Sequence, residues 1–251
     1  MTYNILFGGQ PLDFLFEIYR RDRIPELLDV IRAVDPDILG IQEAWSWNTD
    51  DYPAVSAIAD ELGMNYVITP SHSEESEPQR LCIVVFTKHE IIEYEGWLDD
   101  YVHPSLRTAI RLPSGSVLQV FNAHLTGNLD GVNSEWVRLQ EAKHLIAEMT
   151  PYFDQPCILI GDLNFPASQL LRCTEHPAAC GGPAMRMKPG ELLQENNWTL
   201  VAYEDWLGGL EQIWVNPSLL PQTAEVDVGV ERDDLYTLSD HLPIVVKITI
   251  E

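Results

Sequence analysis

Five short polar segments, each directly after an apolar run, hold the residue types that could carry out chemistry. They are Tyr3-Asn4, Gln42-Glu43, Asn122-Ala123-His124-Leu125, Gly161-Asp162-Leu163-Asn164 and Ser239-Asp240-His241. Their carboxylate and amide oxygens are ligands that Mg²⁺, Mn²⁺ or Ca²⁺ prefer. Their histidines can transfer protons or stabilise charge near neutral pH. The segments therefore predict a site for a hard divalent cation with acid–base groups beside it.

Each segment alone has an ordinary structural explanation. Asn4 alone is typical of a hydrogen-bonding residue at a strand end, and His124 alone is typical of a satisfied core histidine. Asp162 and Asn164 follow a glycine, which is typical of a turn. Five such segments in order, each after an apolar strand, favour one shared site over five separate coincidences.

The elements that must position these segments alternate between strand and helix patterns. Apolar spacing predicts helices over residues 24–34, 53–62 and 133–149. Apolar runs predict strands over residues 2–6, 38–42, 66–69, 81–87, 108–112, 117–122, 157–160, 198–203, 213–215, 225–230 and 244–250. We expect an exposed loop over 71–79 and irregular structure over 172–190. This mixture predicts one layered α/β domain spanning residues 1–251, and ligand groups gather at strand ends in such folds.

The charge of the chain excludes several classes of partner. The 251 residues include 15 Lys and Arg against 39 Asp and Glu, which gives a formal net charge of −24. Such a surface repels phosphate backbones and anionic membranes, so a nucleic-acid partner is not expected. No apolar run reaches the roughly 18 to 20 residues of a membrane span. Met1 leads straight into a predicted strand with no visible signal peptide, so we expect a cytoplasmic monomer.

The four cysteines fall into two pairs. Cys82 and Cys157 lie in apolar runs and are expected to be buried thiols. Cys173 and Cys180 flank a short loop, where they form either a local disulfide worth about 2.5 kcal/mol or two free thiols.

The ordered set of segments resembles the endonuclease/exonuclease/phosphatase superfamily, which has the deoxyribonuclease-I-like fold. The Gly161-Asp162-Leu163-Asn164 and Ser239-Asp240-His241-Leu242-Pro243 segments are the most specific matches, and the resemblance runs from Thr2 to Ile250. It implies an α/β (α+β) four-layer sandwich, with two central mixed β-sheets flanked by helices. It also implies hydrolysis of phosphoesters with a divalent metal.

The resemblance implies a metal site and a water site. Glu43, with Asn4 and Asp240, would hold Mg²⁺, or Mn²⁺ or Ca²⁺, against a phosphate oxygen. Asp162 and Asn164 would position or deprotonate the attacking water, or hold a second metal.

The remaining roles concern the phosphate. His241 would act as a base or stabilise the crowded phosphorus centre, and the choice of base between Asp162 and His241 stays open. His124 would bind phosphate or assist the leaving oxygen. Arg107, before an apolar strand, would clamp a phosphate oxygen.

One residue departs from the family pattern. Members commonly carry Asp in a segment like Ile-Asp-x-Ile-Phe, where it accepts a hydrogen bond from the His of the Ser-Asp-His segment. Here Glu211 takes that place in Leu210-Glu211-Gln212-Ile213-Trp214. We expect Glu211 to orient His241, with a side chain one methylene longer.

Three functions are compatible with these residues. The charge favours a phosphodiesterase or phosphatase for a small phosphorylated molecule or a lipid headgroup. Trp45, Trp47 and Phe165 follow the polar segments and would either stack on a leaving group or pack in the core. A metal-dependent nuclease would need a local basic patch, and the one arginine cluster, at residues 20–23, is expected away from most motifs. A catalytically silent binding module would not need the two histidines and all the carboxylates.

Overall fold

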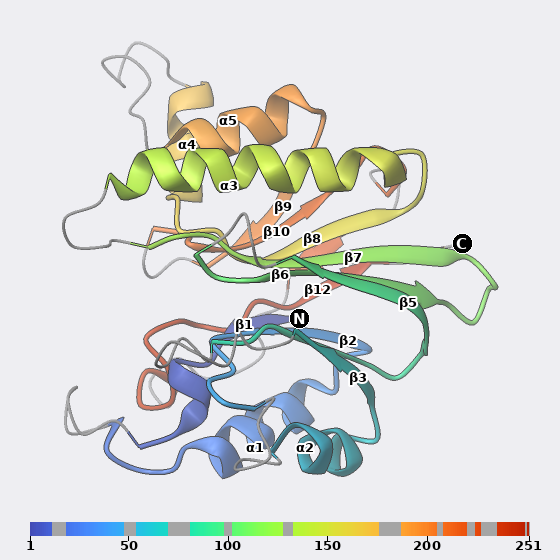
Figure 1. Ribbon diagram of the computed structural model, residues 1–251, viewed down its shortest axis with the longest axis vertical. Coiled ribbons are helices and arrows are strands. Elements are labelled where there is room, and N and C mark those ends of the chain that lie inside the picture. The colour runs from blue at the N-terminus through green and yellow to red at the C-terminus, as the bar shows by residue number, and fades with distance from the viewer. Residues whose placement is uncertain are drawn as a thin grey trace.

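The computed structural model describes residues 1–11, 19–47, 54–69, 81–97, 102–127, 133–175, 187–204, 208–219, 224–226, 235–248 and 250. Two β-sheets pack face to face, and helices cover the outer face of each sheet (Figure 1). The predicted four-layer sandwich with two central mixed sheets is confirmed.

The smaller sheet has four strands and lies over two helices. Its strands are β1 (Thr2–Asn4), β2 (Ile38–Gln42), β3 (Asn65–Ile68) and β4 (Val84–Thr87), in the order β1-β2-β4-β3. Only β1 and β2 pair in parallel among these strands. The covering helices are α1 (Ile24–Val34) and α2 (Ala54–Leu62). Helix α1 carries Pro25 in its first turn and buries Leu27, Leu28 and Ile31 at helical spacing against the sheet.

The larger sheet has six strands, and its central pair is parallel. The strands are β5 (Glu90–Trp97), β6 (Ser105–Arg111), β7 (Val117–His124), β8 (Cys157–Asp162), β9 (Thr199–Tyr203) and β10 (Glu211–Val215), in the order β5-β6-β7-β8-β10-β9. Helices α3 (Ser134–Met149), α4 (Ala167–Glu175) and α5 (Lys188–Glu195) lie on its outer side. Strands β11 (Ala224–Val226) and β12 (Val246–Ile248) form a separate antiparallel pair, and the 3₁₀ turns η1 (Phe7–Gly9) and η3 (Thr150–Tyr152) complete the described elements.

A buried polar contact joins the two sheets across their apolar interface. The Nε2 atom of Gln42 on β2 donates to Oδ1 of Asn122 on β7 at 2.6 Å, and Nδ2 of Asn122 donates to the carbonyl oxygens of Ile41 and Val84. Both side chains are fully buried, so leaving either one unpaired would cost free energy. Asn122 therefore supports the sandwich, two residues before His124 on β7.

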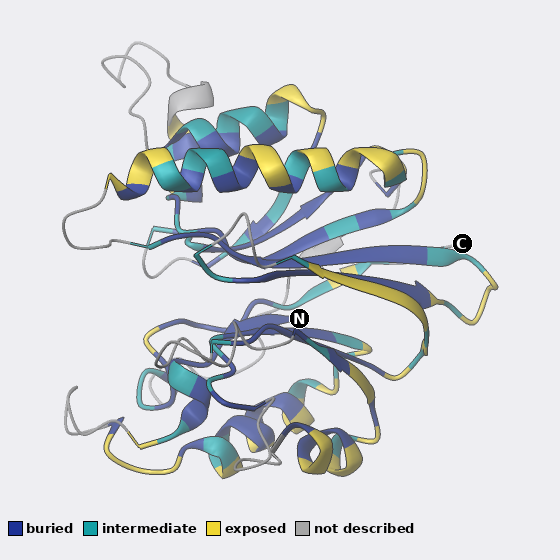
Figure 2. Cartoon of the chain, viewed as in Figure 1, coloured by how far each residue is buried: buried dark blue, intermediate teal, exposed yellow. Residues whose placement is uncertain are grey.

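The structure differs from the sequence prediction at two places. The sequence pattern does not reveal β5, because β5 is a mostly exposed edge strand with a bulge between Ile91 and Glu93 that breaks any alternation (Figure 2). The predicted irregular stretch over 172–190 is wrong at both ends, where α4 and α5 form. The loop predicted over 71–79 and the pairing of Cys173 with Cys180 lie outside the described residues and side chains, while Cys82 and Cys157 are buried thiols as predicted.

None of the helices in the described part of the chain combines the length and hydrophobicity that a membrane crossing requires.

Gly161 is required by the close approach of β8 to β7. Its φ is +138°, and a Cβ atom there would lie 1.9 Å from the carbonyl oxygen of Ala123. We expect Gly161→Ala to lower the free energy of unfolding by about 3 kcal/mol or more, measured by urea unfolding. Gly115→Ala is the matched control, because Gly115 also has a positive φ, +89°, but open space around it. Its expected loss is only about 1 kcal/mol, and equal losses in the two variants would contradict the steric explanation.

Candidate active site

The polar segments meet because parallel strands end at the same edge of a sheet. Asn4 lies opposite Gln42 at the ends of β1 and β2, and His124 lies opposite Asp162 at the ends of β7 and β8. The Ser239 hydroxyl donates to the carbonyl oxygen of Asn4 at 2.7 Å, which ties the last segment to the same place. All five segments therefore contribute to one cluster, formed at the facing ends of the two sheets.

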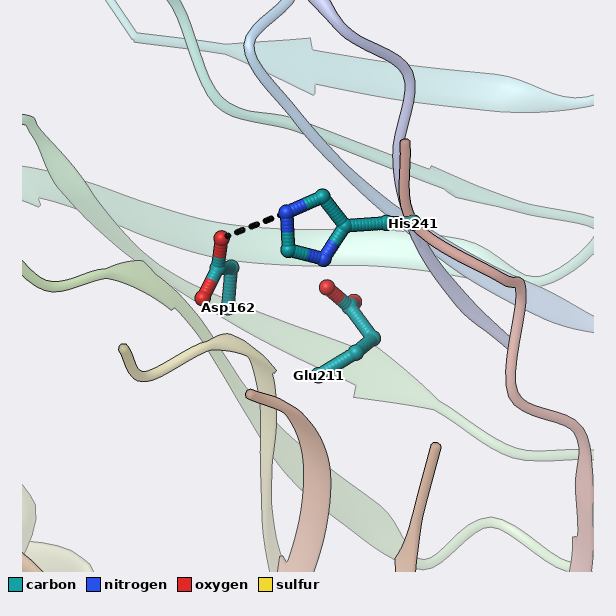
Figure 3. A group of neighbouring side chains, drawn as sticks. All are labelled: Asp162, Glu211 and His241. Atoms are coloured by element: carbon teal, nitrogen blue, oxygen red, sulfur yellow. Dashed lines mark ion pairs between the residues drawn. The ribbon is translucent and has the colours of Figure 1, made fainter. Parts of the chain in front are cut away.

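Asp162 is the centre of this cluster. Its Oδ2 atom accepts a hydrogen bond from Nδ2 of Asn4 at 3.1 Å. The same oxygen lies 3.4 Å from Nε2 of His241 (Figure 3). It also lies 3.6 Å from Nε2 of His124. Its other oxygen accepts the backbone N–H of Asn164 at 3.0 Å. One buried carboxylate thus lies between two imidazoles and an amide.

Glu43 is held beside Asp162 by the amide of Asn4. Nδ2 of Asn4 also donates to Oε1 of Glu43 at 3.0 Å, and the backbone N–H of Phe7 donates to Oε2. Glu43 is half-buried and has a φ of +56°. A left-handed conformation at a residue that is not glycine is strained, and such strain concentrates at functional sites.

Asn164 also has a left-handed backbone, with a φ of +52°. Its side-chain Nδ2 donates to the carbonyl oxygen of Leu125 at 2.8 Å. The amide therefore ties the end of β8 to the end of β7. Asp240, the next predicted ligand, is exposed beside His241.

Glu204, which sequence reasoning missed, contacts His241 on the side opposite Asp162. Oε1 of Glu204 lies 3.4 Å from Nδ1 of His241, and Oε2 accepts the backbone N–H of Leu242 at 3.0 Å. Glu204 directly follows the strand predicted over 198–203, so its place at a strand end was the available signal.

Glu211 points toward the imidazole, but its hydrogen bond goes elsewhere (Figure 3). The hydroxyl of Thr2 donates to Oε1 of Glu211, and the same hydroxyl accepts from Nε2 of Gln42 at 3.0 Å. Oε2 of Glu211 is buried and has no hydrogen-bond donor among the described residues. Among the described ion pairs, Glu204, rather than Glu211, is the acid within 4 Å of Nδ1 of His241, although the two atoms do not form a hydrogen bond.

Burial and clustered charge shift two pKa values at the site. Burial, together with the nearby charge of Asp162, raises the pKa of Glu211 well above its usual range. Burial alone would lower the pKa of His241, but the charge of Asp162 and the contact with Glu204 outweigh it and raise that pKa well above its ordinary value.

Arg107 does not reach the cluster, which corrects its predicted role as a phosphate clamp. It pairs with Phe121 across β6 and β7 and so lies on the helix-facing side of the sheet, whereas His124 lies on the other side. Its guanidinium packs 4.3 Å from the ring centre of Tyr152 and donates to Gln119. The face of the sheet to which Arg107 points is decided by the alternation of side chains along β6, and no sequence motif reveals that face.

Arg23 lies closer to the site than the sequence predicts. Its buried guanidinium donates to the carbonyl oxygens of Leu6, Gln10 and Leu238. It thereby ties the segment after β1 to the residue just before Ser239-Asp240-His241. Arg23 directly precedes α1 and follows no predicted strand, so the sequence pattern does not predict this contact.

The aromatic side chains that follow the polar segments differ in exposure. Trp45 is half-buried, with its ring centre 5.5 Å from that of Phe7. Trp47 and Phe165 are core residues, so they do not offer a face to a leaving group. His103, which the sequence analysis did not single out, stacks on His124 with the ring centres 4.2 Å apart.

The donor set fits a divalent cation. One ligand atom from each of Asp162, Glu211 and His241 lies within 4.8 Å of the others, and Glu43 adds a further carboxylate next to Asp162. Several buried acids gathered without a Lys or Arg paired to them among the described residues are stabilised by a bound cation. Oxygen-rich ligands of this kind suit a hard metal.

Comparison with known proteins agrees with this geometry. The model of the Endonuclease/Exonuclease/phosphatase family matches residues 1–241. The chain belongs to this family. No curated protein matches it in a search by sequence.

Solved structures of family relatives share the fold at low identity. The human Nocturnin catalytic domain with bound sulfate anion is 18% identical, with a TM-score of 0.62 over 98% of this chain and 93% of that chain. A mannosyl-6-phosphatase from Bacteroides thetaiotaomicron is 16% identical, with a TM-score of 0.64 over 99% and 98%. A 3'-5' exonuclease from Neisseria meningitidis is 14% identical, with a TM-score of 0.62 over 98% of each chain. These relatives include both phosphatases and nucleases, so the family alone does not decide the substrate.

The raised pKa of Glu211 predicts how stability depends on pH in metal-free protein. A carboxyl group whose pKa is raised on folding contributes stability below its unfolded value of 4.5 and loses it as the pH rises through the folded value. Gln cannot ionise. We therefore expect the free energy of unfolding of Glu211→Gln, relative to wild type, to increase as the pH rises above 4.5.

The measurement is urea unfolding across the pH range in the presence of EDTA. Glu90→Gln is the control, because it removes the same charge from an exposed position on β5. If the difference in the free energy of unfolding between Glu211→Gln and wild type does not vary with pH, the pKa of Glu211 is not raised by folding.

Proposed function

We propose that the protein is a divalent-metal-dependent phosphoesterase, a phosphodiesterase or phosphatase, that acts on a small phosphorylated molecule or a lipid headgroup. The observation that carries this proposal is the carboxylate of Asp162 between His241, His124 and Asn4, with Glu43 on the same amide. It provides a base and two proton carriers around a single point, as hydrolysis of a phosphoester requires.

Glu43, Asn4 and Asp240 are the residues proposed to hold the metal, which is Mg²⁺ or a similar hard cation. When bound, such an ion neutralises charge on a non-bridging phosphate oxygen. Asp162 and Glu211 offer further oxygen ligands beside them.

The protein's own groups are proposed to move the protons. Asp162 lies where it can accept a proton from the attacking water, and its second oxygen is fixed by the N–H of Asn164. His241 in its charged form stabilises the phosphate oxygens, and His124, which lies near the same oxygen of Asp162, donates toward the leaving oxygen. Asn4 and Asn164 orient these groups through hydrogen bonds to Glu43, Asp162 and the strand ends.

The basic residues of the described chain support a small substrate over a nucleic acid. Several form ion pairs with acids: Arg21, Arg32, Lys88, Arg107, Arg111 and Lys188. Arg23 and Arg138 are buried on backbone carbonyls. A cation that is already paired contributes little to binding a phosphate backbone, and the net charge of −24 opposes that binding further.

Glu43→Gln tests the metal site. We expect the variant to lose Mg²⁺ affinity and phosphoesterase activity by about two orders of magnitude or more, because the charge that binds the cation is gone. The apo protein is expected to keep its stability, since repulsion between acids falls. The measurement is a Mg²⁺ titration of hydrolysis of bis-p-nitrophenyl phosphate and p-nitrophenyl phosphate. Glu195→Gln, at an exposed position on α5, is the control, and an unchanged Mg²⁺ dependence in Glu43→Gln would overturn the assignment.

Binding to a random DNA duplex tests the substrate class. At about 0.15 M salt we expect no binding tighter than about 10⁻⁴ M, because the surface is acidic. Fluorescence anisotropy with a labelled duplex provides the measurement, and cleavage of plasmid DNA is assayed in parallel with the two nitrophenyl esters. Tight duplex binding together with DNA cleavage would replace the proposal with a nuclease.

A further inference from the structure

Two buried glutamates lie on the same side of His241, and they make different contacts. Glu204 follows β9, and its backbone N–H donates to the carbonyl oxygen of Glu211 on β10 at 3.1 Å. The neighbouring backbones therefore bring both carboxyl groups toward one imidazole, from adjacent strands. Both side chains are fully shielded from solvent, so each must find partners inside the protein.

The carboxylate of Glu204 contacts the His241 segment at two points. Oε2 accepts the backbone N–H of Leu242 at 3.0 Å, and Oε1 lies 3.4 Å from Nδ1 of His241. The first contact fixes the position of the carboxylate against the chain that carries the imidazole. The second faces the ring nitrogen away from Asp162, so the ring is held from both sides.

The carboxyl group of Glu211 is engaged with the first strand. Thr2 donates to Oε1 of Glu211, Gln42 donates to the hydroxyl of Thr2, and Gln42 also donates to Asn122. This chain of hydrogen bonds runs from β10 through β1 and β2 to β7. Glu211 is thus one end of the polar network that joins the two sheets.

We propose that Glu204 is the positioning residue of His241, and that Glu211 has moved from this role to the network between the sheets. The kinetic consequence of this proposal rests on the proposed function, whereas the contacts of the imidazole ring do not. A carboxylate accepts hydrogen bonds only, so Glu204 keeps a proton on Nδ1 of His241. Nε2 is then the nitrogen that faces Asp162 and the reacting phosphate.

The backbone contact makes the effect of an amide predictable. In Glu204→Gln the N–H of Leu242 needs the amide oxygen as its acceptor, which turns the NH₂ group toward Nδ1 of His241. An NH₂ group donates, so Nδ1 must become the acceptor and the proton must reside on Nε2. The substitution therefore removes the proton from Nδ1 and keeps the one on Nε2, which faces Asp162, with almost no change in side-chain shape.

Nitrogen NMR of the histidine side chains tests this in metal-free and in Mg²⁺-loaded protein, without any need for turnover. We expect the Nδ1 signal of His241 to move to the unprotonated range in Glu204→Gln and to keep its protonated position in Glu211→Gln. Glu141→Gln is the matched control, because Glu141 is a buried glutamate that accepts the backbone N–H groups of Val102 and Thr126. It is expected to lose stability without moving the His241 signal.

The opposite pattern, loss of the Nδ1 proton in Glu211→Gln and no loss in Glu204→Gln, would overturn the proposal. An Nδ1 signal that is unchanged in both variants would overturn it as well. If Glu204→Gln does not fold, Glu204→Asp replaces it: the shorter side chain cannot keep both contacts, so the Nδ1 signal is expected to shift, while Glu211→Asp leaves it in place.

Kinetics with the nitrophenyl esters give the second readout. We expect kcat of Glu204→Gln to fall at least about tenfold while KM stays within about twofold, because the proton on Nδ1 of His241 matters in the reaction more than in binding. A roughly tenfold rise in KM with an unchanged kcat would contradict a positioning role. If wild type hydrolyses neither ester, the proposed function fails while the NMR result still decides the role of Glu204.

Discussion

Asp162 is a carboxylate buried beneath the meeting point of two sheets, and most of the site is arranged around its charge. An ion removed from water is stable only where donors surround it. Asn4, Asn164 and the two imidazoles provide them here. The acids that gather nearby add more negative charge than these donors offset. A site of this kind suits a bound cation, and its negative charge raises the pKa of His241.

The sandwich maintains this arrangement through contacts at some distance from it. Gly161 permits the close approach of β7 and β8 that places His124 opposite Asp162. Gln42 and Asn122 fix the two sheets relative to each other, and Arg23 fixes the segment that precedes His241. Glu43, with its left-handed backbone, is held by hydrogen bonds from Asn4 and from the backbone N–H of Phe7. Rigid elements on several sides thus hold each reacting group.

The surface and the site differ in how their charges are arranged. Outside, acids outnumber bases, and the basic residues of the described chain are largely paired or buried. Inside, buried acids gather around Asp162, although the proposed substrate is itself an anion. The two features are compatible when a bound metal supplies local positive charge and when the substrate is small enough to approach without a long contact over the acidic surface.

The sequence alone determines the family, the sandwich and most of the site. Asn4, His124 and Asp162 each end a strand, Glu43 directly follows one, and parallel strands bring such ends together. His241 lies outside the described strands, on the segment that Ser239 ties to Asn4. Only the tertiary structure decides which carboxylate meets which imidazole nitrogen. Glu204 and Glu211 lie on neighbouring strands, and their partners depend on ångström-scale positions that no spacing encodes. Arg107 was misplaced for a related reason, since one step along a strand moves a side chain to the opposite face.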